Sequence, residues 1–205
     1  MGTIAIIDYG VGNLRSVEKA FAANGVQARV TAIRDEIKRA EKLVLPGVGA
    51  FGSCMRGLSE RGFDKLVIDR VNDGVPLLGV CVGMQILFEE SEEFGCTKGL
   101  GILKGRVRRF DKEMLVPQVG WNSIRQCRQH LLFAGIPDDA FFYFVHSYYC
   151  EPEDSDATLG ITDYGSAYTS IVAKGNVCGV QFHPEKSQAV GLKMLANFWE
   201  FVSGP

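Results

Sequence analysis

The sequence predicts one α/β domain over residues 1–205, in which helices flank a mostly parallel central sheet that antiparallel strands extend. Two patterns predict this fold. In the first third, short apolar runs alternate with helical periodicity, and such strands form parallel sheets covered on both faces. Beyond Gly101, strand-like runs follow one another with only turns between them, which is typical of antiparallel pairing. A chain of 205 residues can bury one sizeable core without disulfides.

The first half of the chain supplies the expected parallel strands and their helices. The apolar run Thr3–Ile7 predicts the first strand, and a Gly-rich turn leads into a helix from about Leu14 to Ala23, with Gly25 just past its end. The same patterns predict the elements that follow. They are strands at 26–32, 42–45 and 75–80, a helix at 58–72 and helical character over 83–93.

The second half supplies the antiparallel extension and a closing helix. Strands are expected at 119–124, 141–149, 157–162 and 169–173, followed by an apolar strand that ends at His183. Ser187 is expected to cap the last helix. The apolar stripe of that helix consists of Leu192, Leu195, Trp199 and Val202. One alternating segment, 105–110, has a basic edge that is either solvated surface or a docking face.

Composition excludes several classes of function. The net charge of −2 provides no positive field for nucleic acid or anionic lipid, and no apolar stretch approaches the length of a membrane span. The N-terminus does not resemble a signal peptide, so the six cysteines are interpreted as free thiols in the reducing cytoplasm. Their spacing fits no zinc site, and neither a metal nor another cofactor is expected. All of them except Cys81 are expected to be buried structural thiols.

Cys81 is the candidate nucleophile, because it lies between two glycines where a buried strand meets a helix, in Gly79-Val80-Cys81-Val82-Gly83. In such an elbow the glycines remove side chains that would collide, and the central side chain stands above the sheet edge. The first N–H groups and the dipole of the following helix favour the thiolate over the thiol.

His183 is the candidate base among the three histidines, because it ends an apolar strand and is followed by Pro184 and Glu185. Glu185 can orient the ring and stabilise the imidazolium, as the third member of a catalytic triad does. If the strand continued, residues two apart would point the same way. His146 lies in an aromatic strand and is expected to be structural or substrate-lining, and His130 is expected at the surface.

A tetrahedral intermediate at Cys81 needs N–H donors for its oxyanion. The N–H of Val82 follows the nucleophile directly. A second donor is expected from the Gly-rich loop after an earlier strand, at Val48 or Gly49. An ordinary tight turn is the structural alternative for this loop.

These motifs resemble the class I, or triad-type, glutamine amidotransferases, through the loop at 46–49, the elbow at 79–83 and the His-Pro-Glu at 183–185. The resemblance implies the flavodoxin-like fold of that family. It also implies hydrolysis of glutamine to glutamate through a Cys81 thioester, with the ammonia passed to a synthase.

Within that family, segments 8–14 and 117–122 resemble the glutaminase subunits of imidazole glycerol phosphate synthases, which act in histidine biosynthesis. This implies a separate (β/α)8-barrel cyclase subunit as the partner in a heterodimer. The resemblance also implies roles for individual residues. The implied substrate contacts are Gln85, Glu93, Ser147 and Tyr148, and the implied interface residues are Asn13, Trp121 and Lys186. Glu93 alternatively belongs to a solvated acidic face.

Other functions remain open. The chain could be the glutaminase of another synthase, for vitamin B6, purine or anthranilate formation, although segments 8–14 and 117–122 argue against these. It could be a non-catalytic interaction subunit of the same fold, which would not need Cys81, His183 and Glu185 intact. A thiol hydrolase or a chaperone-like protein of similar α/β architecture would also present an elbow cysteine, but would not need the His-Pro-Glu segment.

Overall fold

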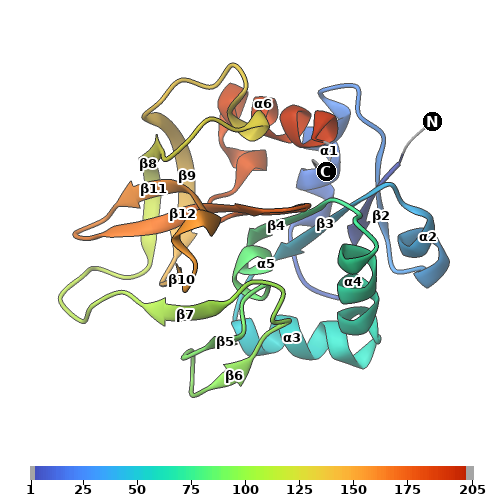
Figure 1. The fold of residues 1–205 in the computed structure, drawn as a ribbon, viewed down its shortest axis with the longest axis horizontal. Helices are drawn as coiled ribbons and strands as arrows, with labels where there is room; N and C mark the ends of the chain where they lie inside the picture. Colours follow the sequence, from blue (N-terminus) through green and yellow to red (C-terminus); the bar gives the residue numbers. More distant parts are fainter. Residues whose placement is uncertain (1–2, 202–205) are drawn as a thin grey trace.

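Parallel strands form the centre of the sheet in the computed structural model, which describes residues 3–201 (Figure 1). They are β1 (Ile4–Ile7), β2 (Ala28–Thr31), β3 (Lys42–Gly47), β4 (Leu77–Cys81) and β13 (Val177–Val180), in the order β2-β1-β3-β4-β13. All but β2 are buried along their whole length, as expected of strands covered on both faces. Each fully buried aliphatic side chain, such as Ile6, contributes about 1.5–3 kcal/mol.

Strands in antiparallel pairs, with one exception, extend this centre beyond β13. They are β5 (Glu90–Ser91), β6 (Thr97–Lys98), β7 (Gly105–Arg109), β8 (Gln118–Gln126), β9 (Ala140–His146), β10 (Tyr148–Pro152), β11 (Thr158–Asp163) and β12 (Ala167–Lys174). β12 pairs antiparallel with β13, β10 with β12 and β7 with β10, while β11, β8 and β9 branch from β12. The exception is β5, which pairs parallel with β7. The predicted fold class, a mostly parallel sheet with an antiparallel extension, is therefore confirmed.

Helices cover both faces of the parallel centre (Figure 1). α1 (Leu14–Ala22) and α6 (Gln188–Glu200) lie together on one face, and α3 (Phe51–Glu60) and α4 (Phe63–Asn72) on the other. α2 (Arg34–Arg39) contacts α4, and α5 (Val82–Gln85) follows β4 directly. Short 3-10 turns lie at Leu131–Phe133, Ser155–Ala157 and Pro184–Lys186. No helix between residues 3 and 201 has both the length and the apolarity to cross a bilayer.

The prediction of one helix at 58–72 is wrong, because two helices occupy residues 51–72. Gly62 separates α3 from α4 with a left-handed φ of 63°, which ends a helix. The strand expected at 141–149 is likewise two strands, β9 and β10, interrupted at Ser147. α2 was not predicted, and Val202 of the expected apolar stripe lies outside the described residues.

The helical character expected over 83–93 is also wrong beyond Gln85. The loop at 99–103 folds against this segment and donates to its carbonyls, with Leu100 N on Ile86 O at 2.8 Å and Gly101 N on Phe88 O at 3.1 Å. These bonds replace those that a longer helix would make, so the segment turns and joins the sheet as β5.

Candidate active site

The carboxyl ends of the central parallel strands meet at one edge of the sheet, and the elbow lies there. Cys81 has φ 56° and ψ −117°, a backbone conformation that costs a non-glycine residue roughly 1–3 kcal/mol. A Cβ on Gly79 would lie 2.6 Å from the Gly83 carbonyl oxygen, and a Cβ on Gly83 only 1.8 Å from that of Leu45. The strained elbow and its need for both glycines are as the sequence indicates. The N–H of Val82, in the first turn of α5, has no partner within the helix.

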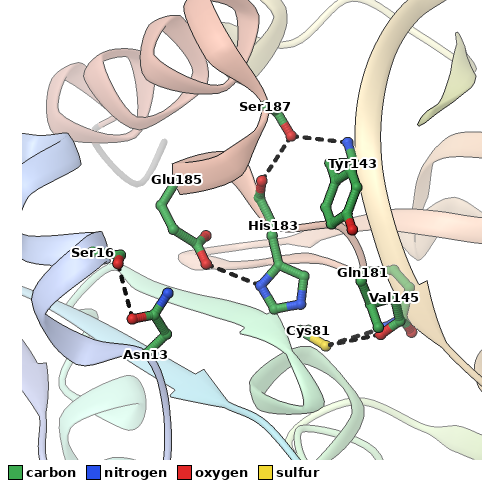
Figure 2. A network of polar contacts seen from close by, with 9 residues as sticks. All are labelled: Asn13, Ser16, Cys81, Tyr143, Val145, Gln181, His183, Glu185 and Ser187. Carbon is green, nitrogen blue, oxygen red and sulfur yellow. Dashed lines mark hydrogen bonds and ion pairs between the residues drawn. The ribbon is translucent and has the colours of Figure 1, made fainter. Parts of the chain in front are cut away.

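The His183 ring lies between Glu185 and Cys81 (Figure 2). Its Nδ1 is 3.0 Å from Oε1 of Glu185, and the two side chains are 6% and 1% exposed. The two side chains do not share a strand register as expected, because Pro184–Lys186 is a 3-10 turn and not a continuing strand. That turn brings the carboxylate back against the imidazole. Among the described residues, Oε2 of Glu185 has no hydrogen-bond partner.

His183 is held in a charged state by its neighbours. Burial alone would lower its pKa, but hydrogen bonds with Cys81 and Glu185 and their negative charge outweigh burial and raise the pKa to about 10. The imidazolium is therefore the favoured form of the ring when Cys81 is a thiolate, so the two charges stabilise one another. A cation of this kind beside a cysteine sulfur favours the thiolate.

The backbone of His183 is anchored to β9. Its N–H donates to the Tyr143 carbonyl at 2.9 Å, and the Ser187 hydroxyl donates to the His183 carbonyl at 2.7 Å (Figure 2). The same hydroxyl accepts from the Tyr143 N–H at 3.0 Å. Ser187 stands at the predicted N-cap position of α6, but its side chain makes no capping hydrogen bond and instead fixes the imidazole against the sheet.

A cavity of about 310 Å³ opens above the elbow and brings most of the predicted site residues together. Its predicted lining residues are Val48, Gly49, Cys81, Val82, Gln85, Glu93, Ser147, Tyr148, His183 and Lys186. Pro117, Val145 and His146 complete the wall. Glu185 lies behind His183. A larger pocket of about 540 Å³ lies over β5, β7 and β10, but no thiol or imidazole lines it, so the smaller cavity is the candidate site.

The predicted oxyanion loop forms one wall of this cavity. Gly49 has φ +89°, which a residue with a side chain rarely adopts. The loop is tied down at both ends, because the Tyr9 hydroxyl donates to the Pro46 carbonyl and the Glu93 carboxylate accepts from Phe51 N at 2.6 Å. Glu93 therefore lines the cavity and caps the first turn of α3, and does not belong to a solvated acidic face.

Of the interface residues expected from the resemblance, only Lys186 lines the cavity. Lys186 is exposed, with its Nζ 5.9 Å from the Tyr143 ring centroid. Asn13 is exposed at the start of α1, which contacts the 3-10 turn of Glu185, and its Oδ1 accepts from the Ser16 hydroxyl at 2.9 Å (Figure 2). Trp121 is 45% exposed on β8, outside the cavity.

The cysteines and histidines outside the elbow fall only partly where expected. All six cysteines lie within residues 3–201 and are free thiols, but Cys96 and Cys127 are exposed and not buried. Gln181 was not among the predicted site residues, yet it is fully buried and its Nε2 lies 3.9 Å from Cys81 Sγ. Its place two residues before His183, on the same face of the strand expected to end at His183, was the available signal. No cluster of three or more metal-ligating side chains occurs between residues 3 and 201.

His146 is almost fully buried and stays neutral. Burial lowers its pKa to about 4 from an ordinary value of 6.5, although the hydrogen bond between Nδ1 and the Tyr148 carbonyl at 2.8 Å acts in the opposite direction. The His146 ring takes up a proton below about pH 6.5 in the unfolded chain, but only near pH 4 in the folded chain. The stability linked to neutral His146 is therefore present above pH 6.5 and lost as the pH falls toward 4.

We expect His146 to lower the free energy of unfolding by about 2 kcal/mol when the pH falls from 7.5 to 5.0. Urea unfolding of the wild type and of His146→Gln at both pH values, followed by circular dichroism, measures the difference. Glutamine cannot take up a proton, so the free energy of unfolding of His146→Gln should fall by about 2 kcal/mol less than that of the wild type between pH 7.5 and pH 5.0. Equal losses in the two chains would contradict a neutral buried His146.

The fold and this elbow place the chain in a known class. A family model described as glutamine amidotransferase class-I matches residues 5–201, and the chain belongs to that family. The solved structures agree at the level of fold. A glutamine amidotransferase crystal structure superposes with a TM-score of 0.76 at 20% identity, and the structure of PurLQS from Thermotoga maritima with 0.76 at 17%. Each covers 97% of this chain and 98% of its own.

Curated relatives narrow the class further. Imidazole glycerol phosphate synthase subunit HisH of Desulfitobacterium hafniense is 48% identical over 98% of this chain and 95% of its own length. The HisH subunits of Chlorobaculum tepidum and Geobacter metallireducens are 46% and 47% identical, over 97% of this chain and 100% and 98% of their own lengths. Within the class-I family, the chain thus belongs to the HisH group.

Proposed function

We propose that the chain is the glutaminase subunit of imidazole glycerol phosphate synthase, and that Cys81, His183 and Glu185 are its catalytic residues. It hydrolyses L-glutamine to glutamate and ammonia, and the ammonia passes to a cyclase subunit in histidine biosynthesis. One observation carries the proposal. The elbow raises Cys81 beside the His183–Glu185 pair, in a cavity whose volume is at the lower end of the range for small-molecule sites, about 300–1,000 Å³.

In the first half of the reaction, the Cys81 thiolate forms a bond to the side-chain amide carbon of glutamine. The carbonyl π electrons move to oxygen, where the N–H of Val82 and an N–H of the loop at Val48 and Gly49 stabilise the charge. When the intermediate collapses, the C–N bond breaks and the His183 imidazolium protonates the leaving nitrogen, which departs as ammonia.

In the second half, water hydrolyses the thioester. His183, now neutral, removes a proton from the water as the hydroxide attacks the carbonyl carbon, and the C–S bond breaks to release glutamate and the Cys81 thiolate. Glu185 keeps the ring oriented and stabilises its charge in both halves. Every step uses groups of this chain, and no cofactor is part of the proposal.

The amino-acid end of glutamine is assigned to the remaining cavity wall. The Glu93 carboxylate suits the substrate ammonium, and its hydrogen bond to Phe51 N fixes it in place. Gln85, Ser147 and Tyr148 line the same wall, with Gln85 bound to the Tyr148 carbonyl at 3.0 Å. This arrangement supports substrate contacts at all four positions.

The proposed partner is a (β/α)8-barrel cyclase subunit in a heterodimer. Val119 and Trp121 of β8 and Phe141 of β9 lie on one face of an antiparallel pair and are between 45% and 59% exposed. An exposed apolar face of this kind marks a protein contact. With Lys186 at the cavity wall and Asn13 at the start of α1, it supports docking of the cyclase over the cavity, and the free thiols support a cytoplasmic location.

The test is glutamate release from glutamine by the chain alone and with the cyclase and its ligand, a phosphoribulosyl formimino carboxamide ribonucleotide. We expect little release by the free chain and rapid release in the liganded complex, because a reactive thioester and a volatile product favour coupled sites. Release that is indifferent to this cyclase would assign the chain to another synthase. Absence of release under all conditions would assign it a non-catalytic role.

A further inference from the structure

Gln181 is a fully buried amide next to the nucleophile, and the mechanism above does not use it. It follows β13, and its backbone N–H donates to the Ser170 carbonyl at 2.9 Å. This hydrogen bond fixes the backbone from which the Gln181 side chain extends, two residues before His183. A buried amide side chain must place both a donor group and an acceptor group, so its surroundings determine which way it points.

The surroundings of Gln181 fix that direction through a chain of contacts. The Tyr148 carbonyl can only accept, so the atom of Gln85 that lies 3.0 Å from it must be Nε2. The second hydrogen of that Nε2 points at Gln181, at 3.0 Å, so Gln181 must present its Oε1 there. The remaining Nε2 of Gln181 consequently faces Cys81 Sγ, at 3.9 Å (Figure 2).

The sulfur thus has two different kinds of neighbour besides His183. The Val145 carbonyl lies 4.0 Å away and can only accept, so it stabilises the thiol and not the thiolate. The Gln181 N–H can only donate, so it stabilises the thiolate. Tyr9, Cys54 and Cys150 are in electrostatic contact with the sulfur, and burial raises the pKa of all three, so they stay uncharged at neutral pH. Glu93 and Lys186 are charged groups that line the same cavity.

We propose that Gln181 is a positioning residue, which holds the Cys81 thiolate through its side-chain N–H and links it to Gln85 on the cavity wall. This inference rests on the proposed function, because it deepens the role of the same nucleophile. Gln181 does not line the cavity in which the substrate is proposed to bind. It acts on the ionisation and direction of the sulfur.

The test is the pH profile of Cys81 alkylation by iodoacetamide, followed by mass spectrometry of the peptide that contains Cys81. Two variants remove the donor, Gln181→Met and Gln181→Glu. The second is nearly isosteric and keeps an oxygen for Gln85, while its carboxylate opposes a neighbouring thiolate. Asn197→Leu is the matched control, because Asn197 is also a buried amide, bonded to the Leu132 and Ala134 carbonyls and not to Cys81.

We expect both Gln181 variants to move the alkylation profile to higher pH and to slow alkylation at pH 7 by roughly 3- to 10-fold. Asn197→Leu should leave the profile in place. In the complex with the cyclase, kcat for glutamine hydrolysis should fall by a similar factor in the Gln181 variants. Because alkylation needs no turnover, this readout stands even if the chain proves not to hydrolyse glutamine.

An unchanged alkylation profile in folded Gln181→Glu would overturn the proposal. A shift of equal size in Asn197→Leu would also overturn it, since the effect would then reflect general loosening of the fold. If Gln181→Glu failed to fold while Asn197→Leu folded, Gln181 would be a structural core residue and the proposal would again be wrong.

Discussion

Cys81→Ala should abolish glutamine-dependent formation of imidazole glycerol phosphate, by a factor of roughly 10⁴–10⁶, and leave formation from added ammonium salts intact. The alanine cannot form the thioester, and no other described thiol stands at the elbow with φ 56° above the cavity. Ammonium supplies the nitrogen directly, so the cyclase chemistry does not need the glutaminase step. The two activities of the reconstituted complex, assayed side by side, measure the effect.

Cys178→Ala is the matched control for this prediction. Cys178 is a fully buried thiol of β13 and pairs with Leu78 of β4 in the same sheet, away from the cavity. Its loss tests whether removing any buried thiol from the sheet is harmful. If Cys81→Ala lost both activities, or if Cys178→Ala lost the glutamine-dependent one equally, Cys81 would have a structural role and not a chemical one.

The elbow could be predicted from sequence because its signal, the spacing of Gly79, Cys81 and Gly83, is local. The collisions behind that spacing are only partly local. A Cβ on Gly79 would lie 2.6 Å from the Gly83 carbonyl oxygen within the turn, but a Cβ on Gly83 would lie 1.8 Å from that of Leu45 on β3.

The choice of His183 and Glu185 also followed from neighbouring residues. Their geometry was missed, although Pro184, which favours the first position of a helical turn, was a local signal for the 3-10 turn that replaces a continuing strand. The Ser187 hydroxyl, hydrogen-bonded to Tyr143 N and to the His183 carbonyl, holds that turn against β9.

The features that escaped prediction depend on contacts between distant segments. α5 ends at Gln85 because the loop at 99–103 donates to carbonyls of the residues that follow the helix, such as Ile86 and Phe88, and nothing within 83–93 signals that loop. The break at Gly62 had a local signal, a glycine within a helical pattern, but glycine is also tolerated inside helices. The network from Tyr148 through Gln85 to Gln181 joins three elements, so it exists only once the sheet is assembled.

His183→Gln should lower glutamine-dependent synthesis by roughly 10²–10⁴-fold, because an amide cannot carry a proton to the leaving nitrogen or take one from water. Glutamine is a better substitution than alanine. Oε2 of Glu185 already has no partner, and alanine would leave the whole buried carboxylate without a donor, which costs about 1–3 kcal/mol or more. The glutamine amide can still donate to Oε1, so folding is preserved while the proton transfer is lost.

The measurements are the two synthase activities together with the thermal midpoint of each chain, and His130→Gln is the control. His130 is half-buried with its ring against Phe201 and lines no part of the cavity. We expect ammonium-dependent synthesis to survive in both variants and alkylation of Cys81 at pH 7 to slow in His183→Gln alone, because the imidazolium beside the sulfur is gone. If His183→Gln retained glutamine-dependent synthesis at the wild-type rate, another group would have to protonate the leaving nitrogen. His146 is unsuited to that role at neutral pH, because burial lowers its pKa to about 4.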